Sequence, residues 1–210
     1  MSIRIAWPRR GLYLLTPDEP DTGRLLARTR PLLGAGIAML QYRNKIADAA
    51  LRMDQAQALA KACHESRTPF IVNDDWKLAL AVDADGAHLG EDDGELREAR
   101  AALGPRRLLG ASCYGRLDLA ERATTAGADY LAFGAFFPSG TKPGARRADP
   151  RLLREAAKFG LPQVAIGGIT PDNADSLIHA GADLVAVIGA VFDAADPVAI
   201  VRAFNLRFES

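Results

Sequence analysis

The stretch AGADLVAV at residues 180–187 joins a helix-ending turn to a short apolar strand, and it has two counterparts earlier in the chain. AGADYLAF spans residues 126–133, and DADGAHL at 83–89 is a weaker counterpart in which small and acidic residues again lead into an apolar run. Glycine permits the left-handed turn that ends a helix, and the apolar run that follows favours a strand. The phrase returns at intervals of roughly one βαβα pair, which indicates a closed barrel more than an open sheet.

Eight short apolar runs, each bounded by polar, Gly or Pro residues, are predicted to be strands. They are Gly11–Thr16, Met39–Arg43, Phe70–Asn73, Gly86–Gly90, Leu108–Ser112, Tyr130–Phe136, Gln163–Gly167 and Leu184–Ile188. Amphipathic stretches and proline starts behind capping residues predict helices between them. These are Asp48–Glu65, Leu96–Leu103, Leu117–Ala126, Pro150–Phe159 and Pro171–Ala180, the last with Thr170 as its N-cap. We therefore expect an α/β fold, a single (β/α)8 TIM-barrel domain over residues 1–210, with an open doubly wound sheet of five or six strands as the alternative.

The composition restricts the class of partner. The 26 Lys and Arg residues balance the 26 Asp and Glu residues, whereas proteins that bind nucleic acid or membrane surfaces usually carry a basic excess. Met1–Arg10 lacks the apolar core of a signal peptide, and no apolar run approaches the roughly 18 residues of a membrane span. Cys63 and Cys113 are far apart and form no metal-binding motif. We expect a reduced, cytoplasmic protein without a nucleic-acid or membrane partner, and the sequence leaves a homo-oligomer open.

Polar residues gather where the predicted strands end. Gln41–Lys45 follows the second strand, Asn73–Asp75 the third, Glu91–Asp93 the fourth and Ser139–Lys142 the sixth, while Ser112 ends the fifth. The opposite ends of the strands carry no comparable set. Because active sites of such barrels lie at the carboxyl ends of the strands, these residues predict an active site at that mouth.

Glycines after the last two strands suggest a phosphate site. Gly167 and Gly168 precede Thr170 and Pro171, and Gly189 closes the eighth strand. Glycines let backbone N–H groups approach an anion, and barrels often build phosphate sites from these two loops. The alternative is that the glycines serve tight turns alone.

Charged side chains at the same mouth suggest a metal-bound diphosphate. Asp74 and Asp93, on separate loops, supply hard oxygen ligands of the kind Mg²⁺ takes when phosphate oxygens and waters complete its coordination. Arg43, Lys45 and Lys142 supply cations suited to the diphosphate. The alternatives without a functional role are that the carboxylates form a solvated acidic face or a helix cap, and that the lysines are simply solvated. Together the groups suggest two small phosphorylated substrates, one carrying a diphosphate.

At these positions the chain resembles the thiamine-phosphate synthase (thiamine-phosphate pyrophosphorylase) family over nearly its whole length. Each motif alone is weakly specific, but their joint order and spacing are specific. The motifs are QYRNK at 41–45, VNDD at 72–75, GAHLG at 86–90, GAS at 110–112, FGAFFP at 133–138 followed by Thr141-Lys142, and AIGGI at 165–169.

The resemblance implies a transferase that condenses 4-amino-5-hydroxymethyl-2-methylpyrimidine diphosphate with a thiazole phosphate, giving thiamine phosphate and pyrophosphate by a dissociative route. It implies that Asp74 and Asp93 hold Mg²⁺ and that Arg43, Lys45 and Lys142 act in catalysis. Implied contacts of the pyrimidine diphosphate are Gln41, Tyr42, Arg43, Asn44, Lys45, Asn73, Ser112 and Lys142. Implied contacts of the thiazole phosphate are Ser139, Gly140, Thr141, Gly168, Ile188 and Gly189.

The chain departs from the family pattern at Asn44, Tyr114, Ser139-Gly140 and Gly189, where acidic, His, Thr-x and Ser residues are common. A thiazole tautomerase of the same fold and a non-catalytic phosphate-ligand sensor remain alternatives, although neither needs a diphosphate clamp. A sugar-phosphate isomerase or aldolase would need an acid–base pair or a Schiff-base lysine inside the barrel, and none is seen in a strand. His88, inside the fourth strand, is expected to be a hydrogen-bonded core histidine.

Overall fold

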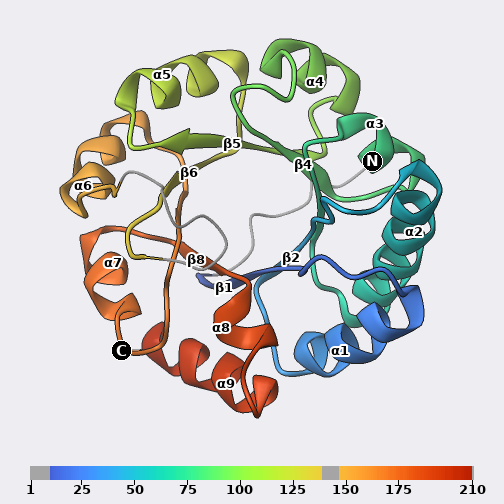
Figure 1. Ribbon diagram of the computed structural model, residues 1–210. Helices are drawn as coiled ribbons and strands as arrows, with labels where there is room; N and C mark the ends of the chain where they lie inside the picture. The colour runs from blue at the N-terminus through green and yellow to red at the C-terminus, as the bar shows by residue number, and fades with distance from the viewer. Residues whose placement is uncertain (1–9, 139–146, 210) are drawn as a thin grey trace.

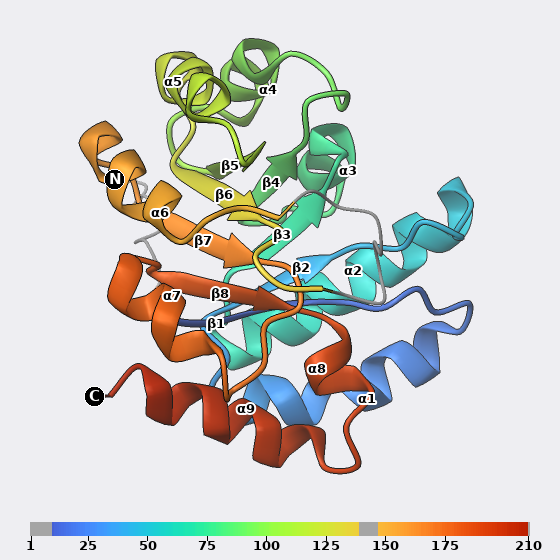
Figure 2. The same cartoon turned by 60° about the vertical axis from the view of Figure 1, so that its left-hand side comes forward.

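Parallel strands form a closed barrel in the computed structural model, which describes residues 10–138 and 147–209. Each strand pairs with the next, and β8 pairs with β1 to close the ring. The strand arrows point in one direction (Figure 2), so the carboxyl ends share one mouth. The predicted barrel is confirmed and the open sheet is excluded. The strands are β1 Gly11–Leu15, β2 Met39–Tyr42, β3 Phe70–Asn73, β4 Gly86–Leu89, β5 Leu108–Tyr114, β6 Tyr130–Gly134, β7 Gln163–Ile166 and β8 Leu184–Val187.

Helices surround the barrel as an outer ring (Figure 1). Those with no counterpart among the predicted ranges are α1 Thr22–Gly34, α3 Trp76–Ala81, α8 Gly189–Phe192 and α9 Pro197–Arg207. The others are α2 Ala49–Ser66, α4 Leu96–Leu103, α5 Leu117–Ala126, α6 Arg151–Ala156, its 3₁₀ extension η1 Ala157–Phe159, and α7 Ala174–Ala180. Within the two described ranges, no helix combines the length and apolarity that crossing a membrane requires.

The start of α7 corrects one expectation. The helix begins at Ala174, three residues after Pro171, so Thr170 is not its N-cap. Asn173 holds the intervening turn instead: its side-chain oxygen accepts from the Thr170 N–H (2.9 Å) and its Nδ2 donates to the Gly168 carbonyl (3.1 Å). The turn keeps the glycine loop after β7 in a fixed position.

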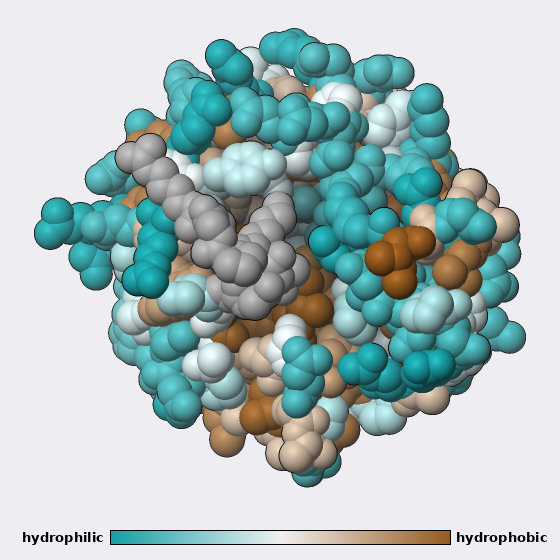
Figure 3. Space-filling view, in the orientation of Figure 1, coloured by the Kyte–Doolittle hydropathy of each residue, from teal (hydrophilic) through white to brown (hydrophobic). Residues whose placement is uncertain are grey.

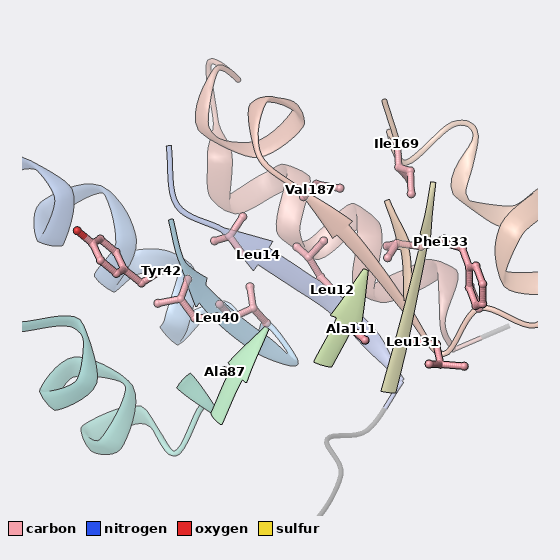
Figure 4. Packing of buried hydrophobic residues seen from close by; sticks show 14 of the residues in the cluster. Leu12, Leu14, Leu40, Tyr42, Ala87, Ala111, Leu131, Phe133, Ile169 and Val187 are labelled. Carbon is pink, nitrogen blue, oxygen red and sulfur yellow. The ribbon is translucent and has the colours of Figure 1, made fainter. Parts of the chain in front are cut away.

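Strand alternation divides the core into two layers. Outward-facing residues such as Leu12, Leu14 and Leu40 pack in the layer between strands and helices (Figure 4). The intervening residues point into the barrel, where Tyr13 and Met39 belong to a separate, smaller cluster. The barrel interior is therefore filled by side chains below the mouth.

The aspartate just before the strand in each repeat of the sequence ties neighbouring strands together at the amino-terminal end of the barrel. The Asp183 backbone N–H donates to the Gln163 carbonyl (2.8 Å), and its carboxylate accepts from the N–H of that same residue (2.8 Å). We call this two-way pair an aspartate clamp. The other two clamps join Asp85 to Phe70 and Asp129 to Leu109.

Removing one clamp should destabilise the fold without affecting the mouth. In Asp183→Ala the backbone N–H of the buried Gln163 loses its side-chain partner, so we expect the free energy of unfolding to fall by about 1–3 kcal/mol. Asp183→Asn keeps an acceptor oxygen and should lose less than half as much. Urea unfolding measures both values. Equal losses in the two variants would contradict the hydrogen-bond explanation.

Candidate active site

A large cavity of about 1490 Å³ opens at the carboxyl ends of the strands. In Figure 3, apolar surface shows in the middle and lower part of the face, with hydrophilic residues above it and to its sides. The cavity exceeds the roughly 300–1,000 Å³ usual for one small ligand, so it has room for two. Ten of the candidate residues line it: Gln41, Arg43, Lys45, Asn73, Asp74, Asp93, Ser112, Gly168, Ile188 and Gly189.

Charged groups from three loops meet on one side of the cavity. The Lys45 ammonium pairs with the Asp74 carboxylate, and Asp74 shares a side-chain hydrogen bond with Asp93. Asp93 also accepts from the Gly90 N–H (2.8 Å). Burial, together with the Asp74 contact, raises the pKa of Asp93. Two carboxyl groups this close need a shared proton or a cation between them.

Asp74 reaches this cluster through an uncommon backbone conformation. Its φ is 63°, in the left-handed region that aspartate tolerates better than most side chains. The Asp74 N–H donates to the His88 carbonyl (2.8 Å), which fixes the turn against β4. Such conformations are retained where the surrounding structure enforces them, often at functional sites.

The segment after β1 holds Arg43 and Lys45 in place. The Asp18 carboxylate accepts from the Arg43 guanidinium (3.1 Å) and from the Lys45 backbone N–H (2.7 Å). The Thr16 hydroxyl donates to the Arg43 carbonyl and accepts from the Arg43 N–H, both at 2.8 Å. The loop after β2 is therefore preorganised, with both cations at the cavity.

Tyr42 and Asn44 are placed differently from the expectation that their side chains contact substrate. Both are buried, and neither lines the cavity. The Tyr42 hydroxyl donates to Gln55 of α2 (3.0 Å), and Asn44 donates to Gln55 (2.9 Å) and to the Glu19 carbonyl (2.7 Å). Tyr42 points toward the helix layer (Figure 4), because residues next to Gln41 in the strand face outward. We revise their role to supporting the loop.

A chain of hydrogen bonds crosses the barrel at the floor of the cavity, and four of its five members line the cavity. Gln41 Nε2 donates to the Tyr13 hydroxyl (2.8 Å), which contacts the Tyr130 hydroxyl (2.9 Å). Tyr130 contacts His88 Nδ1 (3.1 Å), and His88 Nε2 contacts Ser112 Oγ (2.9 Å). Burial lowers the pKa of His88 to about 4 and raises the pKa of both tyrosines, so at neutral pH the imidazole is uncharged and the phenols are protonated.

His88 is the core histidine that the sequence predicts, but Tyr13 and Tyr130 were not among the candidates. The sequence feature that could have identified them is the alternation of inward- and outward-facing residues along each strand. Tyr13 stands two residues after Gly11 at the start of β1, and Tyr130 begins β6. Deciding for each strand which alternate residues face the interior would have placed both rings inside the barrel with His88.

The glycines after β7 and β8 lie against neighbouring groups. Gly168 has a φ of +64°, and a Cβ there would stand 2.2 Å from the Pro138 carbonyl oxygen. A Cβ on Gly189 would meet the Asp193 carboxylate at 2.7 Å. The candidates that lie outside the described residues are Ser139, Gly140, Thr141 and Lys142.

Three other reactive side chains of the described residues lie outside the cavity lining. His64 and His179 are exposed on helices. Cys113 is buried, and burial raises the pKa of its thiol to about 12, which leaves it unsuited to act as a nucleophile.

A closed (β/α)8 barrel with acids, cations and glycines at one mouth defines a barrel enzyme. A family model described as thiamine monophosphate synthase matches residues 12–191. The chain is 58% identical over 199 residues to a thiamine-phosphate synthase of Xanthomonas campestris pv. campestris, covering 95% of this chain and 96% of that one. It is 55% identical to that of Methylobacillus flagellatus, covering 96% of each.

A solved structure agrees with these matches. The chain is similar to a thiamine phosphate pyrophosphorylase from Pyrococcus furiosus, with a TM-score of 0.84, 34% identity and 95% of each chain covered. The chain belongs to the thiamine monophosphate synthase family.

Proposed function

We propose that this protein is a thiamine-phosphate synthase, a transferase that joins 4-amino-5-hydroxymethyl-2-methylpyrimidine diphosphate to a thiazole phosphate and releases pyrophosphate. The observation that carries the proposal is the contact of Lys45, Asp74 and Asp93, brought from three loops to one side of the cavity. A diphosphate leaving group needs such a mixture of cations and metal-binding acids.

The two carboxylates fit Mg²⁺. Asp74 and Asp93 offer hard oxygen ligands in mutual contact, and a divalent cation would relieve the repulsion that their contact implies. Within residues 10–138 and 147–209, no group of three or more His, Cys, Asp or Glu is arranged to hold a metal unaided. That agrees with an ion that also takes diphosphate oxygens and water. When bound, the ion would neutralise charge on the diphosphate.

The residues at the mouth support a dissociative reaction. The bond between the pyrimidine methylene carbon and the diphosphate oxygen breaks, and its electron pair leaves with the diphosphate. Arg43 and Lys45, joined by Lys142 as the resemblance implies, stabilise that developing charge. The aminopyrimidine delocalises the methylene cation, and the thiazole nitrogen then forms the new carbon–nitrogen bond. No step needs a proton from the protein.

The thiazole phosphate would bind on the opposite side of the cavity. Gly168, Ile188 and Gly189 line the cavity there, and the resemblance adds Ser139, Gly140 and Thr141. Gln41, Asn73 and Ser112 also line the cavity and would contact the pyrimidine. This division would leave the reacting carbon and nitrogen between the two groups of residues.

The direct test incubates the purified protein with both substrates and Mg²⁺. Thiamine phosphate and pyrophosphate should appear in equal amounts, and omitting either substrate or adding EDTA should stop both. A tautomerase would instead rearrange the thiazole phosphate alone, without the pyrimidine. Absence of thiamine phosphate with folded protein and both substrates would refute the proposal.

A further inference from the structure

Three buried side chains join Gln41 to Ser112 across the barrel. We propose that Tyr13, Tyr130 and His88 are positioning residues that fix Gln41 as a hydrogen-bond acceptor and Ser112 as a donor toward the pyrimidine. The inference rests on the proposed function, and it adds a basis for selecting an aminopyrimidine.

Counting protons limits the chain to two arrangements. It contains four contacts, and each needs one proton. If the hydroxyl protons of Tyr13 and Tyr130 both stay within the chain, the protons must all point one way. Either Gln41 donates at one end and His88 donates to Ser112 at the other, or every direction is reversed.

Gln41 Nε2 donates to Tyr13, which selects the first arrangement when both tyrosine protons stay within the chain. Tyr13 then donates to Tyr130, and Tyr130 donates to Nδ1 of His88. His88 must carry its proton on Nε2 and donate it to Ser112. The Ser112 hydroxyl proton and the Gln41 carbonyl oxygen are left for the cavity that both residues line.

Packing holds the middle of the chain rigid. The rings of His88 and Tyr130 are stacked at 28°, with centroids 5.5 Å apart. Gly110 makes room for them, since a Cβ there would stand 2.1 Å from the Tyr130 ring and 2.4 Å from His88 Nδ1. His88 and both tyrosines are buried. Packing therefore fixes the heavy atoms of the chain, so that reversing one contact requires reversing the others as well.

The fixed ends match the two kinds of polar group on a 4-aminopyrimidine. Its amino group donates a hydrogen bond and its ring nitrogens accept one, which suits Gln41 and Ser112 respectively. In the 4-oxo analogue the substituent accepts instead of donating, so the contact with Gln41 is reversed. Sites that leave polar groups unpaired reject such analogues strongly.

The test compares turnover of the 4-amino and 4-oxo pyrimidine diphosphates in the wild type, Tyr130→Phe and Tyr13→Phe. We expect the wild type to prefer the amino substrate by at least about 10³-fold in kcat/KM. Each variant breaks the chain and frees its ends to reorient, so the preference should fall at least tenfold, mainly through the KM of the pyrimidine. The KM of the thiazole phosphate should not change. Thr29→Val, which removes a buried hydroxyl bonded to the Leu25 carbonyl of α1, is the matched control and should keep the preference.

A second readout needs no substrate. Nitrogen-15 NMR of His88 should show the proton on Nε2 in the wild type and a mixture of tautomers in Tyr130→Phe. An unchanged amino-to-oxo preference in folded Tyr130→Phe and Tyr13→Phe, or a proton on Nδ1 in the wild type, would overturn the inference. If the wild type makes no thiamine phosphate from the amino substrate, the proposed function fails instead, and the NMR result still reports on the chain.

Discussion

Replacing Asp93 or Asp74 by alanine is expected to lower Mg²⁺-dependent kcat/KM by at least about 10³-fold. This corresponds to roughly 4 kcal/mol of transition-state stabilisation. Each variant removes half of the carboxylate pair, and Asp74→Ala also removes the partner of Lys45. Steady-state kinetics over a range of Mg²⁺ concentrations measures the loss, and excess Mg²⁺ should restore part of it.

Glu91→Ala is the matched control for this prediction. Glu91 lies in the same loop as Asp93, but its carboxylate pairs with Arg116 on the surface (3.1 Å). Removing an exposed pair of this kind should change kcat/KM by less than about fivefold. Thermal unfolding of all three variants shows whether the fold is intact. Full activity in a folded Asp74→Ala or Asp93→Ala variant would show that the metal assignment is wrong.

Gly168→Ala should raise the KM for thiazole phosphate by on the order of 10²-fold, because small displacements at a binding site carry such penalties. The new Cβ would stand 2.2 Å from the Pro138 carbonyl oxygen. That oxygen is a backbone atom, so no side-chain rotation can relieve the overlap. Pro138 must therefore move, and it directly precedes the residues that the resemblance assigns to the phosphate. The KM for the pyrimidine diphosphate should change much less.

Gly160→Ala separates displacement from backbone strain. Gly160 has nearly the same φ, +67°, but a Cβ there would meet nothing within 4 Å. It should lose about 1–2 kcal/mol of stability, the usual penalty for the left-handed conformation, without a kinetic effect. If both variants raise the KM equally, the overlap with Pro138 is not the cause.

The sequence predicts the barrel well because polar, Gly or Pro residues stand just before most of the apolar runs and so show where the strands begin. All eight strands begin at the predicted residue, and the repeated phrase marks three of those starts. Helix starts are less reliable: Asn173, not Thr170, closes the turn before α7, since its side chain can bond both Thr170 and Gly168. Residue type alone does not distinguish these capping roles.

The sequence predicted which loops form the candidate site, but not always which side chains of those loops face the cavity. Gln41 and Tyr42 are neighbours, yet strand alternation sends one into the barrel and the other toward α2. The contact of Tyr13 with Tyr130 joins β1 to β6, which are not adjacent in the barrel. Such contacts depend on how far each ring extends across the barrel interior. The residue pattern of a single strand predicts the direction of a side chain but not this distance.

The aspartate clamps carry an evolutionary consequence. They secure the barrel at the end away from the cavity, so the loops at the mouth can be exchanged, shortened or lengthened without removing what holds the strands in register. Descendants of this chain could acquire altered ligand preferences while inheriting the same scaffold. Engineers could likewise diversify the mouth in libraries and leave Asp85, Asp129 and Asp183 untouched.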